Sequence, residues 1–110
     1  MFAKYLKETK EYETLETEDG IFTYRIYPVS HILDIGDMYV KPDKRTGLAF
    51  KKMYDKIGEI GIANKCDKVT CNVETYQTNP ERAMYMMLRN RFKYSHFNNG
   101  VIYFYRKLME

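Results

Sequence analysis

The chain has 110 residues, of which 45% are hydrophobic and 30% charged, and its net charge at pH 7 is +3. This length and composition predict one folded domain, residues 1–110, and exclude a disordered chain. No apolar run approaches the roughly 20 residues of a membrane helix, and residues 1–10 have no apolar signal-peptide core, so we expect a cytoplasmic protein. The small positive charge does not favour a nucleic-acid partner but would suit a phosphate-rich ligand.

Two β-prone runs, residues 11–17 and 21–29, flank the dipeptide Asp19-Gly20. This pattern predicts a hairpin in which the dipeptide supplies the positive φ angles of a tight turn. Residues 31–40 are again strand-like.

The alternation of residues 31–40 predicts one face with Leu33, Ile35 and Tyr39, and another with Ile32, Met38 and Val40. Gly36, in the middle of this strand, indicates a bulge or the close approach of another part of the chain.

A helix is predicted over residues 45–60, because Ala49, Met53, Ile57 and Ile60 recur at helical spacing, and Gly61 would end it. Residues 67–74 then read as a strand that is parallel to the preceding one, since a helix joins the two.

A second helix is predicted from Pro80 to about Asn90, with Asn79 as its N-cap. Residues 92–97 and 101–107 would form a second hairpin around residues 98–100. The fold class is therefore α/β with a mixed sheet. Cys66 and Cys71 have no nearby histidine, so we read them as ordinary thiols and expect no metal.

The most informative stretch is the junction between residues 38 and 49, where a strand ends and a helix begins after Lys44-Arg45-Thr46-Gly47-Leu48-Ala49. The first N–H groups of a helix lack acceptors within it and bind phosphate groups. Small residues at Gly47 and Ala49 would let phosphate oxygens approach the backbone, and Lys44 and Arg45 add positive charge. Taken alone, such a loop also suits an ordinary solvated turn.

The order of elements, together with Lys44-x-x-Gly47-x-Ala49 at the start of a helix, resembles the GNAT acetyltransferase superfamily over residues 21–107. The resemblance implies a GNAT-like, mostly antiparallel sheet with a central splayed parallel pair and two helices (α+β in detail), and acetyl-CoA as the acyl donor. It implies coenzyme A contacts from Met38, Val40, Lys44, Arg45, Thr46, Gly47, Leu48 and Ala49. Residues 69–74 would form the second splayed strand.

Three departures from the family pattern stand out. Lys44 replaces the usual Arg or Gln, which preserves charge but loses bidentate geometry. Met87 stands where the family often has a tyrosine that protonates the leaving thiolate, and Tyr85 would point to another face. Only residues 1–10 precede the first hairpin, so we expect the acceptor-side wall, which the family builds from an opening strand and two helices, to be absent or supplied by another chain.

Asp37 is the preferred candidate for a general base, since a half-buried strand carboxylate would have a raised pKa, although a solvent-facing acid fits the pattern too. Asp34 has a weaker claim, and His31 and His96 fit surface positions. The aromatic residues of the last hairpin fit sheet packing better than base stacking.

Two functions stay open. The first is an N-acetyltransferase that moves an acetyl group from acetyl-CoA to an amine or protein acceptor. The second is an inactive GNAT-like structural or interaction module, for example in a phage virion or bound to a host protein. An uncovered sheet edge would favour a homodimer or a protein partner.

Overall fold

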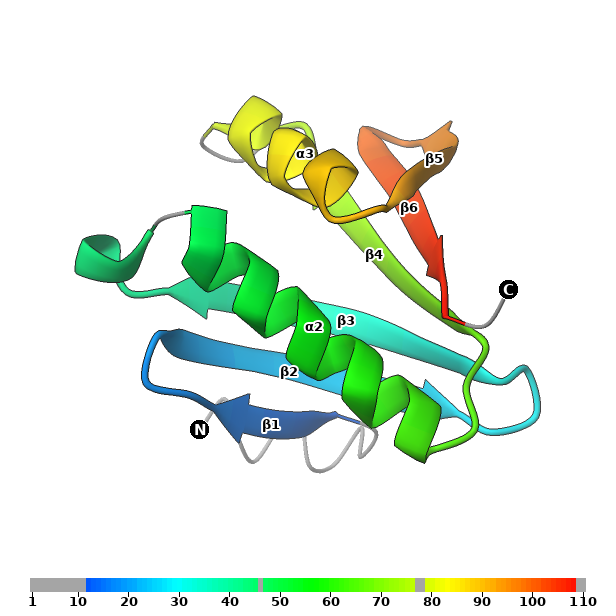
Figure 1. The fold of residues 1–110 in the computed structure, drawn as a ribbon. Helices are drawn as coiled ribbons and strands as arrows, with labels where there is room; N and C mark the ends of the chain where they lie inside the picture. Colours follow the sequence, from blue (N-terminus) through cyan, green and yellow to red (C-terminus); the bar gives the residue numbers. More distant parts are fainter. Residues whose placement is uncertain (1–11, 46, 77–78, 109–110) are drawn as a thin grey trace.

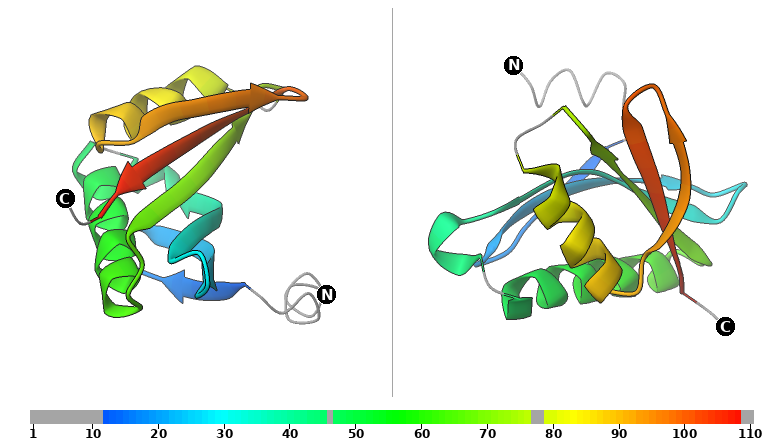
Figure 2. Two further views of the ribbon diagram at one scale, coloured as in Figure 1. Left: turned by 90° about the vertical axis from the view of Figure 1, so that its right-hand side faces the viewer. Right: turned by 90° about the horizontal axis from the view of Figure 1, so that it is seen from above.

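The computed structural model describes residues 12–45, 47–76 and 79–108. Six strands form one sheet in the order β1-β2-β3-β4-β6-β5. The elements are β1 (Glu13–Glu16), β2 (Gly20–Tyr27), β3 (Ile32–Val40), the 3₁₀ helix η1 (Pro42–Lys44), α2 (Gly47–Ala63), β4 (Lys68–Glu74), α3 (Pro80–Arg89), β5 (Lys93–Asn98) and β6 (Val101–Lys107). Both helices lie on the same side of the sheet (Figures 1 and 2). None of the helices in the described part of the chain is long and apolar enough to cross a membrane.

The sheet is mixed, as the sequence predicted. Neighbouring strands are antiparallel except β3 and β4, which run parallel and are joined through α2. The parallel pairing is short, extending from Ile32 opposite Lys68 to Asp34 opposite Thr70. Beyond these residues β3 and β4 diverge, and the opening between their ribbons is visible in Figure 1. The predicted central splayed pair is therefore confirmed.

A bulge interrupts β3 at Gly36, as predicted. Tyr24 pairs with Ile35, but Phe22 pairs with Met38, so Thr23 on β2 faces both Gly36 and Asp37. The Thr23 hydroxyl accepts a hydrogen bond from the Asp37 N–H at 2.8 Å. A Cβ at position 36 would lie 2.5 Å from Tyr12 Cε1 and 2.6 Å from Thr23 Oγ1, so only glycine fits without displacement.

Because of the extra residue in the bulge, the predicted assignment of side chains to the two faces of β3 was wrong beyond Gly36. Leu33 and Ile35 are buried, but after the bulge Val40 joins their face while Tyr39 is 50% exposed. The core lies between the sheet and the two helices, and its largest fully buried side chains are Phe22, Leu33, Ile35, Met53, Ile57, Met87 and Val69.

The first hairpin forms as predicted, but for a different reason at its turn. Neither Asp19 nor Gly20 has a positive φ. Gly20 is required because a Cβ there would lie 2.0 Å from the carbonyl oxygen of Tyr39. In the second hairpin Asn99 and Gly100 do have positive φ angles, 52° and 78°, as a tight turn requires.

Two predictions about helix ends were wrong. The first helix does not end at Gly61 but continues to Ala63, and Gly61 packs closely against Leu108. Asn79 does precede Pro80, but it adopts a left-handed conformation and its side chain makes no capping hydrogen bond.

Candidate functional site: a slot between two diverging strands

The divergence of β3 and β4 creates a cavity of about 190 Å³, here called the splay slot. One wall is formed by residues 35–38 of β3 and the other by residues 71–74 of β4. The helices close it with Phe50, Tyr54, Ala83, Met86 and Met87. The short parallel pairing therefore leaves a cavity with one strand on each side.

A second cavity of about 410 Å³, here called the helix-start cavity, adjoins the slot, because Met38, Phe50 and Ala83 line both. Its other lining residues are Tyr39, Val40, Arg45, Asn79 and Arg82. Together the two cavities lead from the bulge at Gly36 to the region where α2 begins.

Two arginines give the helix-start cavity positive charge, and none of the described residues that line it is acidic. Arg45 Nε donates to the carbonyl oxygen of Val40 at 2.8 Å, and its guanidinium lies over the ring of Tyr39. Arg82, from α3, donates to the carbonyl oxygen of Arg45 at 3.3 Å. These two cations and the start of α2 fit an anionic group such as a phosphate.

The structure brings part of the predicted loop to this cavity. Met38, Val40 and Arg45 line it, and Lys44 lies in η1 beside it in sequence. Gly47 opens α2, where an added Cβ would have no atom within 4 Å, and Leu48 is 63% exposed. Ala49 is instead 5% exposed, so its small side chain serves packing. Thr46 lies outside the described residues.

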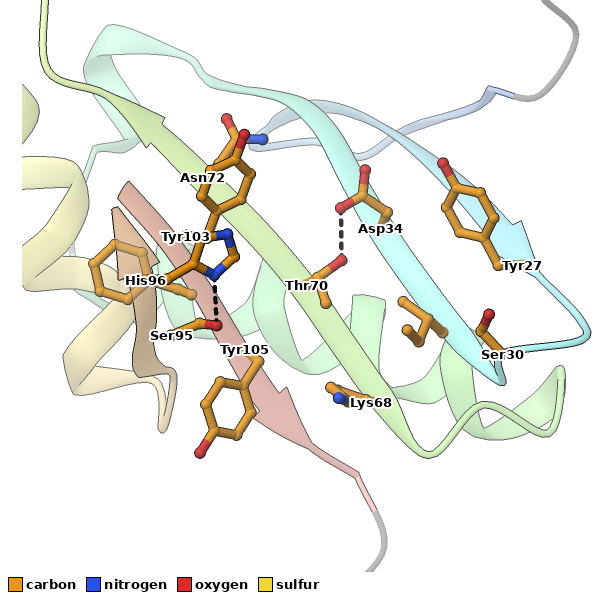
Figure 3. A pocket seen from close by; sticks show the side chains of 12 residues that line it. Tyr27, Ser30, Asp34, Lys68, Thr70, Asn72, Ser95, His96, Tyr103 and Tyr105 are labelled. Atoms are coloured by element: carbon orange, nitrogen blue, oxygen red, sulfur yellow. Dashed lines mark hydrogen bonds between the residues drawn. The ribbon is translucent and has the colours of Figure 1, made fainter. Parts of the chain in front are cut away.

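The two aspartates differ in burial. Asp37 lines the splay slot and is exposed, which is the solvent-facing alternative stated for it, and the half-buried form is not observed. Asp34 is the more enclosed one: burial raises its pKa, and this effect is opposed by the hydrogen bond from Thr70 and by the charge of Arg25. Thr70 Oγ1 donates to Asp34 Oδ1 at 2.6 Å across the last parallel pair of β3 and β4 (Figure 3).

Tyr54 was not singled out from the sequence, although it lines the slot beside Met87. Its side chain is only 6% exposed, and burial raises the pKa of its phenol well above the ordinary value. The phenol is therefore a weaker acid than an ordinary tyrosine, and at neutral pH it stays protonated and can act as a hydrogen-bond donor.

Cys71 also lines the slot, and burial raises the pKa of its thiol to about 12. It is thus a neutral thiol at pH 7 and a poor nucleophile. His31 lies in the turn between β2 and β3, and His96 is exposed on β5, where its ring stacks on Tyr103. The described residues contain no cluster of side chains suited to a metal ion.

No protein-family model and no curated protein sequence matches the chain. Solved structures do. The chain is similar to the N-acetyltransferase PseH from Campylobacter jejuni, with a TM-score of 0.77 and 16% identity over 98% of this chain and 76% of that one. It is similar to an acetyltransferase from Bacillus subtilis in complex with CoA, with a TM-score of 0.70 and 13% identity over 96% and 84% of the two chains.

A third similar structure is an acetyltransferase assigned to the GNAT family from Desulfovibrio desulfuricans, with a TM-score of 0.70 and 14% identity over 97% of this chain and 76% of that one. At such identities the likeness shows the architecture. The chain therefore has the fold of these acetyltransferases. This is the GNAT fold that the resemblance implied, with the splayed β3–β4 pair at its centre.

Proposed function

We propose that the protein is an N-acetyltransferase that uses acetyl-CoA and an amine acceptor. The observation that carries the proposal is the pair of adjoining cavities, the splay slot and the helix-start cavity, with Arg45 and Arg82 in one and Asp37 and Tyr54 in the other. Acetyl-CoA would supply a thioester whose carbonyl carbon accepts an amine. Its narrow arm suits the slot and its phosphates suit the helix-start cavity.

Binding would rest on the helix-start cavity. Arg45 and Arg82 would contact phosphate oxygens, and the N–H groups of Gly47 and Leu48 open the helix. Lys44, the neighbour of Arg45 in sequence, stays a candidate for a further contact. Met38 lines both cavities, so its backbone N–H is our candidate for stabilising the negative charge that develops on the carbonyl oxygen. Val40 contributes through its backbone at the same strand end.

In the reaction the amine nitrogen forms a bond to the carbonyl carbon, and the carbon–sulfur bond breaks with its electron pair going to sulfur. Asp37 would accept the proton that the amine loses, directly or through water. Tyr54 would donate a hydrogen bond to the sulfur as negative charge develops on it, and the thiolate would take its proton from solvent. In this way a phenol from α2 would serve where the tyrosine expected on α3 is replaced by buried Met87.

The test has two stages, and the first is calorimetry of acetyl-CoA binding to the full chain at micromolar concentration. The second is release of free thiol from acetyl-CoA in the presence of a panel of primary amines. Asp37→Asn should retain binding and lose most of the transfer, about 100-fold if Asp37 is the base. Glu81→Gln, an exposed acid on α3, is the matched control and should change neither.

Binding without transfer to any amine would favour the second candidate, an inactive interaction module with the same fold, for which the buried Met87 is the supporting observation. Absence of binding at millimolar acetyl-CoA would contradict the enzyme proposal.

A cytoplasmic location remains part of the proposal. We also propose a homodimer or a protein partner, because β1 and β5 are the edge strands of the sheet and could pair with another chain. Light scattering that shows a monomer would contradict the homodimer.

A further inference from the structure

The face of the sheet opposite the helices carries a pocket of about 560 Å³, larger than either cavity described above. Here it is called the open-face pocket, and Figure 3 shows that its side chains come from β2, the β2–β3 turn, β3, β4, β5 and β6. It is lined by Tyr27, Ser30, Ile32, Asp34, Lys68, Thr70, Asn72, Ser95, His96, Tyr103, Phe104 and Tyr105. A cavity of this volume suits a small molecule.

The pocket holds one carboxylate and one ammonium, and among the described residues neither has an ion-pair partner. Thr70 occupies Asp34 Oδ1, but no described residue donates to Oδ2. Lys68 Nζ lies at 5.8 Å from the ring centre of Tyr105. Both charges can therefore serve a ligand.

The other cation near Asp34 does not neutralise it by direct contact. Arg25 pairs with Asp34 in the β2–β3 register, but its guanidinium lies between the rings of Tyr12 and Tyr27, at 4.8 Å from each. Its Nε is buried and has no hydrogen-bond partner among the described residues. The arginine is thus held beside the pocket by ring contacts, and Asp34 keeps an oxygen for an incoming donor.

Aromatic rings form much of the remaining wall. Tyr27 lies on one side of Asp34, and Tyr103 and Tyr105 lie on the other (Figure 3). The ring of His96 stacks on Tyr103 with centroids 4.4 Å apart and an interplanar angle of 8°. Such rings bind apolar side chains and aromatic groups.

The order of these groups along β4 gives the pocket a direction. Lys68 comes first, Thr70 with Asp34 follows, and Asn72 comes last. Asn72 also lines the splay slot, so this end of the pocket is the one nearest the slot. Successive inward positions on a strand are about 6.6 Å apart. A positive group at Asp34 would therefore lie nearer the slot than a negative group at Lys68.

We propose that the open-face pocket binds a small amino acid with an apolar or aromatic side chain, its ammonium at Asp34 and its carboxylate at Lys68. This inference rests on the proposed function and names the class of acceptor for it. The amine then lies toward the slot, the acid points away from it, and the side chain packs on the tyrosine rings. A diamine would leave Lys68 opposed to a second positive charge and is disfavoured.

The experiment uses the full chain without acetyl-CoA and three probes of similar shape: L-phenylalanine, phenethylamine, which lacks the carboxylate, and 3-phenylpropionate, which lacks the amine. We expect L-phenylalanine at millimolar concentration to shift the NMR signals of β3 and β4 around Asp34 and Thr70. It should bind about tenfold more tightly than either analogue, as one charged hydrogen-bonded contact is lost in each.

Two variants assign the charges. Asp34→Asn should weaken L-phenylalanine and phenethylamine about tenfold but leave 3-phenylpropionate unchanged, whereas Lys68→Met should weaken L-phenylalanine and 3-phenylpropionate only. Lys52→Met, an exposed position on α2, is the control and should change nothing. Equal binding of L-phenylalanine and phenethylamine, signal shifts away from the pocket, or no shift at all would overturn the proposal.

A parallel titration with acetyl-CoA separates this inference from the enzyme proposal. If acetyl-CoA shifts residues 35–38 and 71–74 while L-phenylalanine shifts nothing, the acceptor class is wrong and the enzyme proposal stands. If L-phenylalanine binds as described and acetyl-CoA does not bind, the pocket stands and the enzyme proposal fails.

Discussion

Substitution of Gly47 by glutamate tests the phosphate end of the site most directly. The position opens α2 and nothing lies within 4 Å of a Cβ there, so the larger side chain fits. A carboxylate in the first turn also interacts favourably with the helix dipole, by about 0.3–1 kcal/mol. The variant should therefore fold as well as the wild type.

The effect on binding can be estimated from Coulomb's law. A new negative charge about 6 Å from a pyrophosphate with two charges, at an effective dielectric constant of about 40, costs about 1.4 kcal/mol for each charge pair. The sum of ~3 kcal/mol corresponds to roughly 100-fold weaker binding of acetyl-CoA.

Calorimetry at low salt, with urea unfolding as the check on stability, measures this effect. Ile62→Glu is the matched control, because it adds the same charge at an exposed position about 22 Å along the same helix. It should bind acetyl-CoA like the wild type. If Gly47→Glu folds and binds with unchanged affinity, the phosphates do not lie at the start of α2 and the reasoning is refuted.

The slot, the bulge and the enclosed aspartate each lead to a further prediction. Tyr54→Phe should keep acetyl-CoA affinity but lower the transfer rate about tenfold or more, and the defect should shrink with thioesters whose thiols are more acidic; an equal defect for all thioesters would argue for packing alone. Gly36→Val should lower the free energy of unfolding in urea by about 1–3 kcal/mol, because its Cβ would overlap Tyr12 and Thr23, whereas Gly47→Ala should cost nothing; a neutral Gly36→Val would contradict the bulge. Burial raises the folded-state pKa of Asp34 above 3.8, so its contribution to stability is largest below that pH and falls as the pH rises. In urea unfolding from acid to neutral pH, Asp34→Asn should therefore gain stability relative to the wild type. A difference between the two proteins that does not change with pH would contradict the raised pKa.

Periodic patterns carried most of the fold prediction. The helical spacing of Ala49, Met53 and Ile57 located α2, and a helix between two strands implied their parallel pairing. Gly36 located the bulge, but not its consequence. An inserted residue reverses the alternation of the strand, and for that reason Tyr39 faces outward although simple counting placed it with Leu33.

The site was only partly predictable, because its members come from different elements. Arg45 and Gly47 stood out as neighbours in one loop. Arg82 and Tyr54 did not, since their contribution depends on where α3 packs relative to α2 and on which face of α2 meets the splay. A tyrosine in a helical apolar face is ordinarily core, and only the cavity beside it distinguishes Tyr54.

The limited pairing between β3 and β4 also offers a way to observe ligand occupancy without an assay of activity. Past Asp34 and Thr70, β3 and β4 are not paired with each other. The backbone N–H and C=O groups that point across the gap therefore make no hydrogen bonds between these two strands. In hydrogen–deuterium exchange, alternate amides of residues 35–40 and 71–74 should therefore lose protection compared with their neighbours facing β2 and β6. A molecule that enters the slot would slow exchange at that alternate set, and the period-two pattern of protection would report it residue by residue.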